Sequence, residues 1–87
     1  MTSKVVMYGT RTCGYCISAR RLLDSKGAAY EDIRVDDYPE RRREISDLGL
    51  RTVPQVWIGG RHIGGFDEMW ALERAGELEA LLEGAAS

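Results

Sequence analysis

This chain of 87 residues lacks long apolar runs and an excess of charge of either sign. The apolar run near the N-terminus stops at Tyr8, and no stretch approaches the ~20 apolar residues that a membrane-spanning helix needs. Twelve Lys and Arg residues against 14 Asp and Glu residues give a net charge of −2, which argues against a basic field for nucleic acid. The cluster Arg41–Arg43 is flanked by Glu40 and Glu44 and is expected to form a solvated helix face. We therefore expect no signal peptide, no membrane association and no nucleic-acid partner.

Cysteine and histidine are also scarce, with two cysteines, Cys13 and Cys16, and one histidine, His62. A structural zinc site needs four ligands, and the chain offers no second Cys or His pair to complete one. A disulfide across so few residues removes little entropy from the unfolded chain, so a purely structural bridge is disfavoured. Inert buried thiols are disfavoured by the turn beside Gly14. The remaining interpretation is a redox-active pair, which in a chain without an export signal indicates the cytosol.

The two cysteines form the motif Cys13-Gly14-Tyr15-Cys16, between an apolar run that ends at Tyr8 and an amphipathic run over residues 17–23. This position predicts that Cys13 lies in a strand-to-helix turn, at a helix N-terminus. There, unpaired backbone N–H groups and the helix dipole stabilise a thiolate, and the pKa of a free cysteine, roughly 8.5, falls. Cys16 follows about one turn later and can close an intramolecular disulfide.

Apolar periodicity and turn residues predict one domain with the element order βαβα followed by ββα. The predicted strands cover residues 4–8, 30–35, 56–58 and 61–63, and the predicted helices cover 16–26, 39–48 and 67–82, the last with a break at Gly76. Asp37 and Asp67 are the expected caps of the second and third helices. Gly59-Gly60 predicts a hairpin. The core is expected over residues 4–82, with a frayed tail over 83–87.

The motifs Cys13-Gly14-Tyr15-Cys16, Thr52-Val53-Pro54 and Gly64-Gly65-Phe66-Asp67, with the ββα ending, resemble those of the glutaredoxins, from about Lys4 to Leu82. The resemblance implies an α/β thioredoxin fold with a four-stranded mixed β-sheet flanked by three or more helices. It also implies a cis peptide bond at Pro54, and glutathione as the thiol partner.

The same resemblance implies a glutathione site. A carboxylate-bearing peptide needs free backbone groups and an anion-binding helix start. Val53 would pair with the peptide backbone, the start of the third helix would hold the γ-glutamyl carboxylate, and Tyr15 would flank the sulfur. The implied glutathione-binding residues are Arg11, Tyr15, Thr52, Val53, Pro54, Gly65, Phe66 and Asp67.

The chain departs from the family pattern at three positions. Thr10 stands where many glutaredoxins carry a lysine that contacts the carboxylate at the glycine end of glutathione. In this chain, Arg11, Arg41 or Arg51 would have to supply the positive charge. Gly14 replaces the common proline and restores a backbone N–H. Phe66 replaces a familiar cysteine, which leaves no third thiol.

The sequence therefore predicts a dithiol glutaredoxin that acts on protein–glutathione mixed disulfides and protein disulfides. Cys13 attacks the substrate, and either glutathione or Cys16 resolves the mixed disulfide. The alternatives are a thioredoxin-reductase-linked electron donor, a carrier of a [2Fe–2S] cluster, and a binding module with inert cysteines. In the carrier, Cys13 would be the ligand, and two chains and two glutathiones would share the cluster. A monomer is expected unless a cluster is bound.

Overall fold

The computed structural model describes residues 3–84, which form a four-stranded sheet with four α-helices. The strands are β1 (Val5–Gly9), β2 (Glu31–Arg34), β3 (Gln55–Ile58) and β4 (Arg61–Gly64). The helices are α1 (Gly14–Ser25), α2 (Arg42–Ser46), α3 (Phe66–Arg74) and α4 (Leu78–Glu83), with a 3₁₀ turn, η1 (Pro39–Arg41), before α2. This order confirms the predicted succession of strands and helices.

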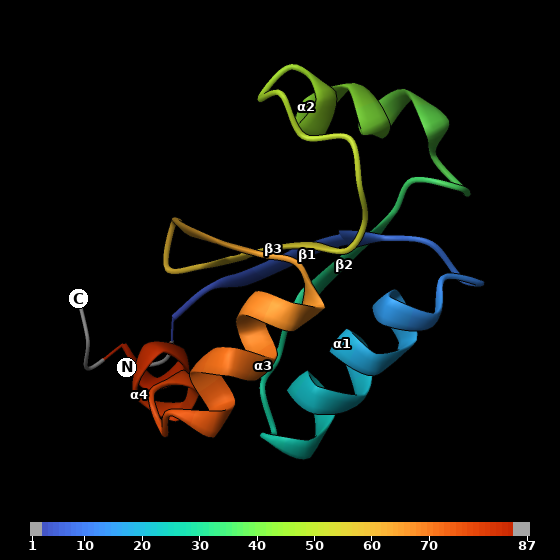
Figure 1. Cartoon of the computed structure of the whole chain (residues 1–87). Helices are drawn as coiled ribbons and strands as arrows, with labels where there is room; N and C mark the ends of the chain where they lie inside the picture. The colour runs from blue at the N-terminus through green and yellow to red at the C-terminus, as the bar shows by residue number, and fades with distance from the viewer. Residues whose placement is uncertain (1–2, 85–87) are drawn as a thin grey trace.

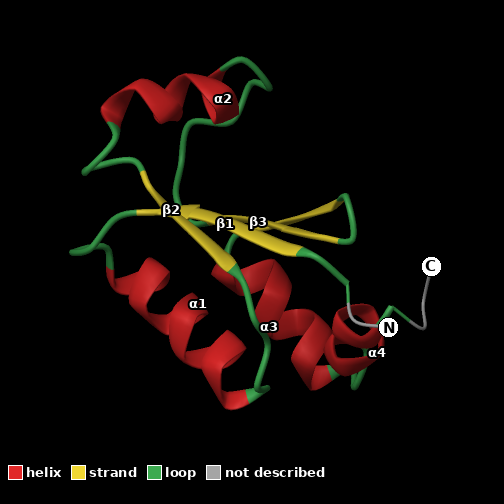
Figure 2. Ribbon diagram, turned by 180° about the vertical axis from the view of Figure 1, so that it is seen from behind, coloured by secondary structure: helices red, strands yellow, loops and turns green. Residues whose placement is uncertain are grey.

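The sheet is mixed, with the strand order β2-β1-β3-β4. β1 runs parallel to β2 and antiparallel to β3, and β3 is antiparallel to β4. Helices α1, α3 and α4 cover one face of the sheet, and α2 lies over the other face (Figures 1 and 2). The parallel β1–β2 pair therefore has α1 as its crossover helix, as expected of a βαβ unit. The predicted mixed sheet is confirmed.

The main core lies between the sheet and the three-helix layer. Burial alternates along β1, because successive side chains of a strand point to opposite faces. The buried cluster comprises Val5, Met7, Cys16, Ala19, Leu22, Leu23, Val56, Ile58, Met69, Leu78, Leu81 and Leu82. It joins β1 and β3 to the apolar faces of α1, α3 and α4, so the helix that carries the cysteines is packed directly on the central strands.

The helix ends show where the sequence-based predictions were wrong. Helix α1 begins at Gly14, earlier than predicted, with Cys13 as its N-cap. The predicted second helix is a 3₁₀ turn followed by the short α2, and Tyr38 precedes it. Asp37 does not cap it, because the Asp37 carboxylate is bonded to the Arg11 side chain.

The C-terminal helical region divides as predicted at Gly76, whose φ of +74° favours glycine. Its start differs from the prediction: Gly65 is the N-cap of α3, and the Gly65 N–H donates to the Glu68 carboxylate at 2.6 Å. Asp67 therefore lies inside the first turn and is not the cap. Glu83, predicted to be in a frayed tail, ends α4; residues 85–87 of that tail lie outside the described residues.

Candidate active site

Cys13 lies at the junction between the loop after β1 and the first turn of α1. Its backbone is extended (φ −73°, ψ 121°), and its sulfur accepts a hydrogen bond from the Cys16 N–H at 3.4 Å. The thiol is half-buried and donates to the Val53 carbonyl oxygen at 3.7 Å. Cys13 therefore faces the segment before β3, across 40 positions of sequence.

Cys16 is completely buried under the first turn of α1. Its sulfur accepts a hydrogen bond from the Thr10 N–H at 3.5 Å. Gly9 leaves the space for this sulfur, because a Cβ at position 9 would lie 3.0 Å from Cys16 Sγ and 3.2 Å from Arg20 Nη2. The Arg20 guanidinium lies beside this sulfur, because both are close to the same Cβ position at residue 9. Asp32 holds the guanidinium in an ion pair at 3.0 Å.

The surroundings separate the pKa values of the two thiols. Burial opposes ionisation of Cys13, but hydrogen bonds from the Cys16 thiol and from the Cys16 and Tyr15 backbone N–H groups, together with the Arg20 charge, lower its pKa. Burial raises the pKa of Cys16 to about 11, and the neighbouring Cys13 adds to that rise. Cys13 is therefore the thiol that ionises more readily, and Cys16 is the one that keeps its proton to higher pH.

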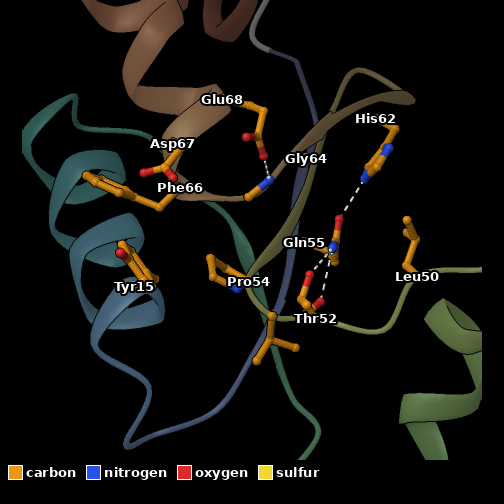
Figure 3. A pocket seen from close by; sticks show the side chains of 12 residues that line it. Tyr15, Leu50, Thr52, Pro54, Gln55, His62, Gly64, Phe66, Asp67 and Glu68 are labelled. Atoms are coloured by element: carbon orange, nitrogen blue, oxygen red, sulfur yellow. Dashed lines mark hydrogen bonds between the residues drawn. The ribbon is translucent and has the colours of Figure 1, made fainter.

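A cavity of about 410 Å³ lies beside Val53, between the segment before β3 and the start of α3 (Figure 3). This volume falls within the range of small-molecule sites. The cavity is lined by Tyr15, Leu50, Thr52, Val53, Pro54, Gln55, His62, Gly64, Gly65, Phe66, Asp67 and Glu68. The structure thus brings together Tyr15, Thr52–Pro54 and Gly65–Asp67, which the sequence proposed as binding residues. The Val53–Pro54 peptide bond is cis, as expected.

Aromatic rings form the α1–α3 side of this cavity. Tyr15 and Phe66 lie with their ring centroids 6.3 Å apart, and Phe66 stacks on Trp70 at 6.2 Å. Tyr15 is 61% exposed and Trp70 is 45% exposed. Phe66, at the position of the missing third cysteine, therefore contributes an apolar wall.

Five lining residues were missed by the sequence analysis: Leu50, Gln55, Gly64, Glu68 and His62. Gln55 could have been found, because it is a polar residue in an apolar strand, directly after Pro54. His62 was considered only as a zinc ligand. Its contact with Gln55 crosses the β3–β4 pair and needs the strand register to be known.

None of the three arginines proposed to bind a carboxylate of glutathione lines the cavity. The Arg11 guanidinium is bonded to Asp37 at 2.8 Å, and the Arg41 guanidinium is bonded to Glu44 at 2.8 Å. Arg51 is exposed and directly precedes Thr52, but it is not a lining residue either.

Within residues 3–84, no group of three or more His, Cys, Asp or Glu side chains is arranged to hold a metal ion. In the same part of the chain, no helix has both the length and the apolar character needed to cross a membrane.

The chain is similar in sequence to known glutaredoxins. Residues 5–63 match the family model described as Glutaredoxin. The glutaredoxin of Pseudomonas aeruginosa is 52% identical over 79 residues, which cover 90% of this chain and 94% of that protein. Glutaredoxin 3 of Escherichia coli K12 is 40% identical over 82 residues, which cover 93% of this chain and 99% of that protein.

Solved structures show the same fold. The crystal structure of a buckwheat glutaredoxin–glutathione complex superimposes with a TM-score of 0.83 at 34% identity, covering 97% of this chain and 80% of that one. The solution structure of glutaredoxin from Brucella melitensis gives a TM-score of 0.83 at 39% identity, covering 97% and 92% of the two chains.

Proposed function

This chain belongs to the glutaredoxin family and is a thiol–disulfide oxidoreductase with the thioredoxin fold, and from that premise we propose that glutathione is its thiol co-substrate. The observation that carries the proposal is the position of the Cys13 sulfur, 3.7 Å from the Val53 carbonyl, which belongs to the wall of the cavity. A tripeptide bound there would have its own sulfur beside the nucleophile. The buckwheat glutaredoxin in the glutathione complex has the same fold.

The cavity presents groups that suit the parts of glutathione. The first turn of α3 begins at Phe66, and the backbone N–H groups of Phe66 and Asp67 at this helix start favour a carboxylate, whereas the Gly65 N–H is already bonded to Glu68. The backbone groups of Thr52 and Val53 suit an extended peptide, as in β-strand addition. Tyr15 and Phe66 cover the apolar part of the ligand. Arg11 is already paired with Asp37, so we propose Arg51, beside Thr52, for the carboxylate at the glycine end.

The proposed reaction begins with the Cys13 thiolate. It attacks the glutathione sulfur of a protein–glutathione disulfide; a Cys13–glutathione disulfide forms, and the protein thiolate leaves and takes up a proton. A second glutathione, as thiolate, then attacks the bound glutathione sulfur. Oxidised glutathione leaves, and the Cys13 thiolate is restored.

A protein disulfide takes a second route. Cys13 attacks one of its sulfurs and forms a mixed disulfide with the substrate. Cys16 then loses its proton and attacks Cys13 Sγ, which releases the second substrate thiolate and leaves a Cys13–Cys16 disulfide. Burial of Cys16 keeps it out of the first step. We propose that the protein acts as a monomer in the cytosol, where the glutathione pool is reduced.

The experiment that tests the proposal couples reduction of a small glutathione mixed disulfide to glutathione reductase and follows NADPH oxidation. We expect a rate that saturates with the glutathione substrate, is abolished by Cys13→Ser, and persists in Cys16→Ser. Asp67→Lys replaces a carboxylate that suits the α-ammonium group of the γ-glutamyl residue by a cation that repels this group, and it should raise the KM about fivefold, while the alkylation rate of Cys13 is unchanged. Asp47→Lys, an equal change of charge outside the cavity, is the matched control.

Two results would contradict the proposal. If thioredoxin reductase supported disulfide reduction by this protein and glutathione did not, the protein would be the thioredoxin-reductase-linked electron donor considered above. A KM that is unchanged in Asp67→Lys would place the γ-glutamyl end of glutathione elsewhere.

A further inference from the structure

Gln55 is the one polar or charged side chain that is buried among residues 3–84, with 6% exposure. Its amide nitrogen donates to the Thr52 carbonyl oxygen at 3.0 Å and lies 3.2 Å from the Thr52 hydroxyl. Its amide oxygen lies 2.7 Å from His62 Nε2 (Figure 3). A buried amide is stable only when both ends are bonded, so these contacts set the orientation of Gln55.

The chemistry of the partners assigns every hydrogen in this chain of contacts. The Thr52 carbonyl can only accept, so the Gln55 atom that faces it must be the amide nitrogen. The Gln55 oxygen must then face His62, because a flipped amide would put two acceptors together. Since that oxygen can only accept, Nε2 of His62 carries a hydrogen and donates it to Gln55.

The ring of His62 is held in place from the side of the sheet. It packs on Trp57 with a centroid distance of 4.7 Å and an interplanar angle of 35°. Trp57 in turn meets Tyr8 edge to face at 5.6 Å. These contacts fix the plane of the imidazole and hence the direction of its Nε2–H.

We propose that His62 and Gln55 are positioning residues for the disulfide exchange at Cys13. The imidazole N–H orients the Gln55 amide, and the amide holds the carbonyl and hydroxyl of Thr52. The Thr52–Val53 peptide is thereby held with the Val53 carbonyl against the Cys13 sulfur. The part of this inference that concerns glutathione binding rests on the function proposed above.

Gln and Glu have nearly the same shape, so these two replacements of His62 separate its donated hydrogen bond from the packing of its ring. In Gln, the amide nitrogen is as many bonds from the backbone as Nε2 is in His, and it can donate to Gln55. In Glu, the equivalent atom is an oxygen that can only accept. Both variants lose the stacking on Trp57 equally, but they differ in one negative charge as well as in the donated hydrogen bond. His62→Met has the same length, no charge and no donor, so its effect should match that of His62→Glu if the hydrogen bond is the cause. Arg61→Gln, at the exposed neighbouring position of β4, is the control.

We expect the KM for glutathione to rise about fivefold in His62→Glu, the effect of losing one hydrogen bond, with kcat within about twofold. His62→Gln should restore most of this loss. The amide resonance of Val53, measured without glutathione, should move in His62→Glu and stay near the wild-type position in His62→Gln. Equal effects of the two variants on the KM or on that resonance would overturn the proposal.

A measurement on the unaltered protein keeps the inference testable if a variant fails to fold. Long-range ¹H–¹⁵N spectra of the imidazole report which ring nitrogen carries the hydrogen. The proposal requires a hydrogen on Nε2, and an imidazole with a hydrogen on Nδ1 alone would overturn it. If wild-type turnover did not depend on glutathione, the proposed function would be refuted. The positioning role of His62 and Gln55 would still be tested, since the imidazole spectra and the Val53 resonance need no glutathione.

Discussion

Replacing Cys16 with alanine tests whether the buried thiol stabilises the Cys13 thiolate. The pKa of Cys13 is lowered against the opposing effect of burial, and the Cys16 thiol is the first donor responsible. A hydrogen bond to a charged group is worth roughly 1.5–3 kcal/mol. Because Cys13 is partly open to solvent, the lower end applies, and roughly 1.5 kcal/mol corresponds to about a tenfold smaller thiolate fraction at a pH below the pKa. Cys16→Ser keeps an O–H donor and should keep the thiolate fraction near that of the wild type.

The reaction rate will change by less than the thiolate fraction does. Nucleophilicity rises with pKa with a Brønsted coefficient of about 0.4–0.5, so a tenfold loss of thiolate comes with an about threefold gain in reactivity per thiolate. We therefore expect Cys16→Ala to react about threefold more slowly than Cys16→Ser at a pH below the Cys13 pKa of both variants, and about threefold faster at the alkaline plateau. The two pH profiles should cross.

The assay is alkylation by iodoacetamide across a range of pH, followed by mass spectrometry. Both variants contain Cys13 as their only thiol, so the measured rate belongs to that residue. Urea unfolding shows whether the loss of a buried sulfur has weakened the fold. Coincident profiles for Cys16→Ala and Cys16→Ser would refute the reasoning, because the Cys16 side chain would then contribute nothing to the ionisation of Cys13.

Three further predictions concern the scaffold around the site. Gly9→Ala puts a Cβ 3.0 Å from Cys16 Sγ and should cost about 1–3 kcal/mol in urea unfolding; an unchanged midpoint would contradict the close packing. Gly14→Pro places proline at the first position of α1, where an added Cβ meets nothing within 4 Å, and should stabilise the protein by about 0.4–1 kcal/mol in thermal unfolding; a loss would contradict it. Burial, and then the bond to Glu44, raise the pKa of Tyr8 from 10.0 to about 12. The folded state therefore holds this proton more tightly than the unfolded state does, and the stability that it contributes below pH 10 is lost as the pH rises towards 12. Urea titrations of Tyr8→Phe should show a deficit relative to the wild type that shrinks over this window, and a constant deficit would refute the assignment.

The local pattern of the sequence was enough to predict the element order. The glycine pair after Ile58 predicts the hairpin between β3 and β4, and the break at Gly76 separates α3 from α4. Both signals act over a few neighbouring residues, because turn conformation depends on the residues that form the turn. The ends of the helices were less predictable, since Glu68 and Asp67 are both suitable partners for the start of α3 and the sequence does not choose between them.

The candidate site was predictable where it depends on motifs and not where it depends on pairs of distant side chains. Arg11 was expected to bind a carboxylate of the ligand, and in the structure Asp37 holds its guanidinium. Asp37 was expected to cap a helix. The expectation that Asp37 caps the helix is wrong, and its pairing with Arg11 could not be foreseen, because opposite charges 26 positions apart meet only after the β1 and β2 ends are brought side by side.

The sequence by itself determined the chemistry available: two thiols at the start of a helix, next to the strand that positions them. It also indicated that Cys13, at the helix start, ionises more readily than Cys16; what it did not determine is the size of the difference between the two pKa values. Tertiary packing decides that difference, because α1 lies on the sheet with Cys16 beneath it and Cys13 at its edge. Packing likewise brings His62 of β4 to Gln55 of β3, and Val53 to Cys13. Burial and hydrogen bonding depend on neighbours in space, so only the folded chain sets how far the two pKa values differ and which backbone groups face Cys13.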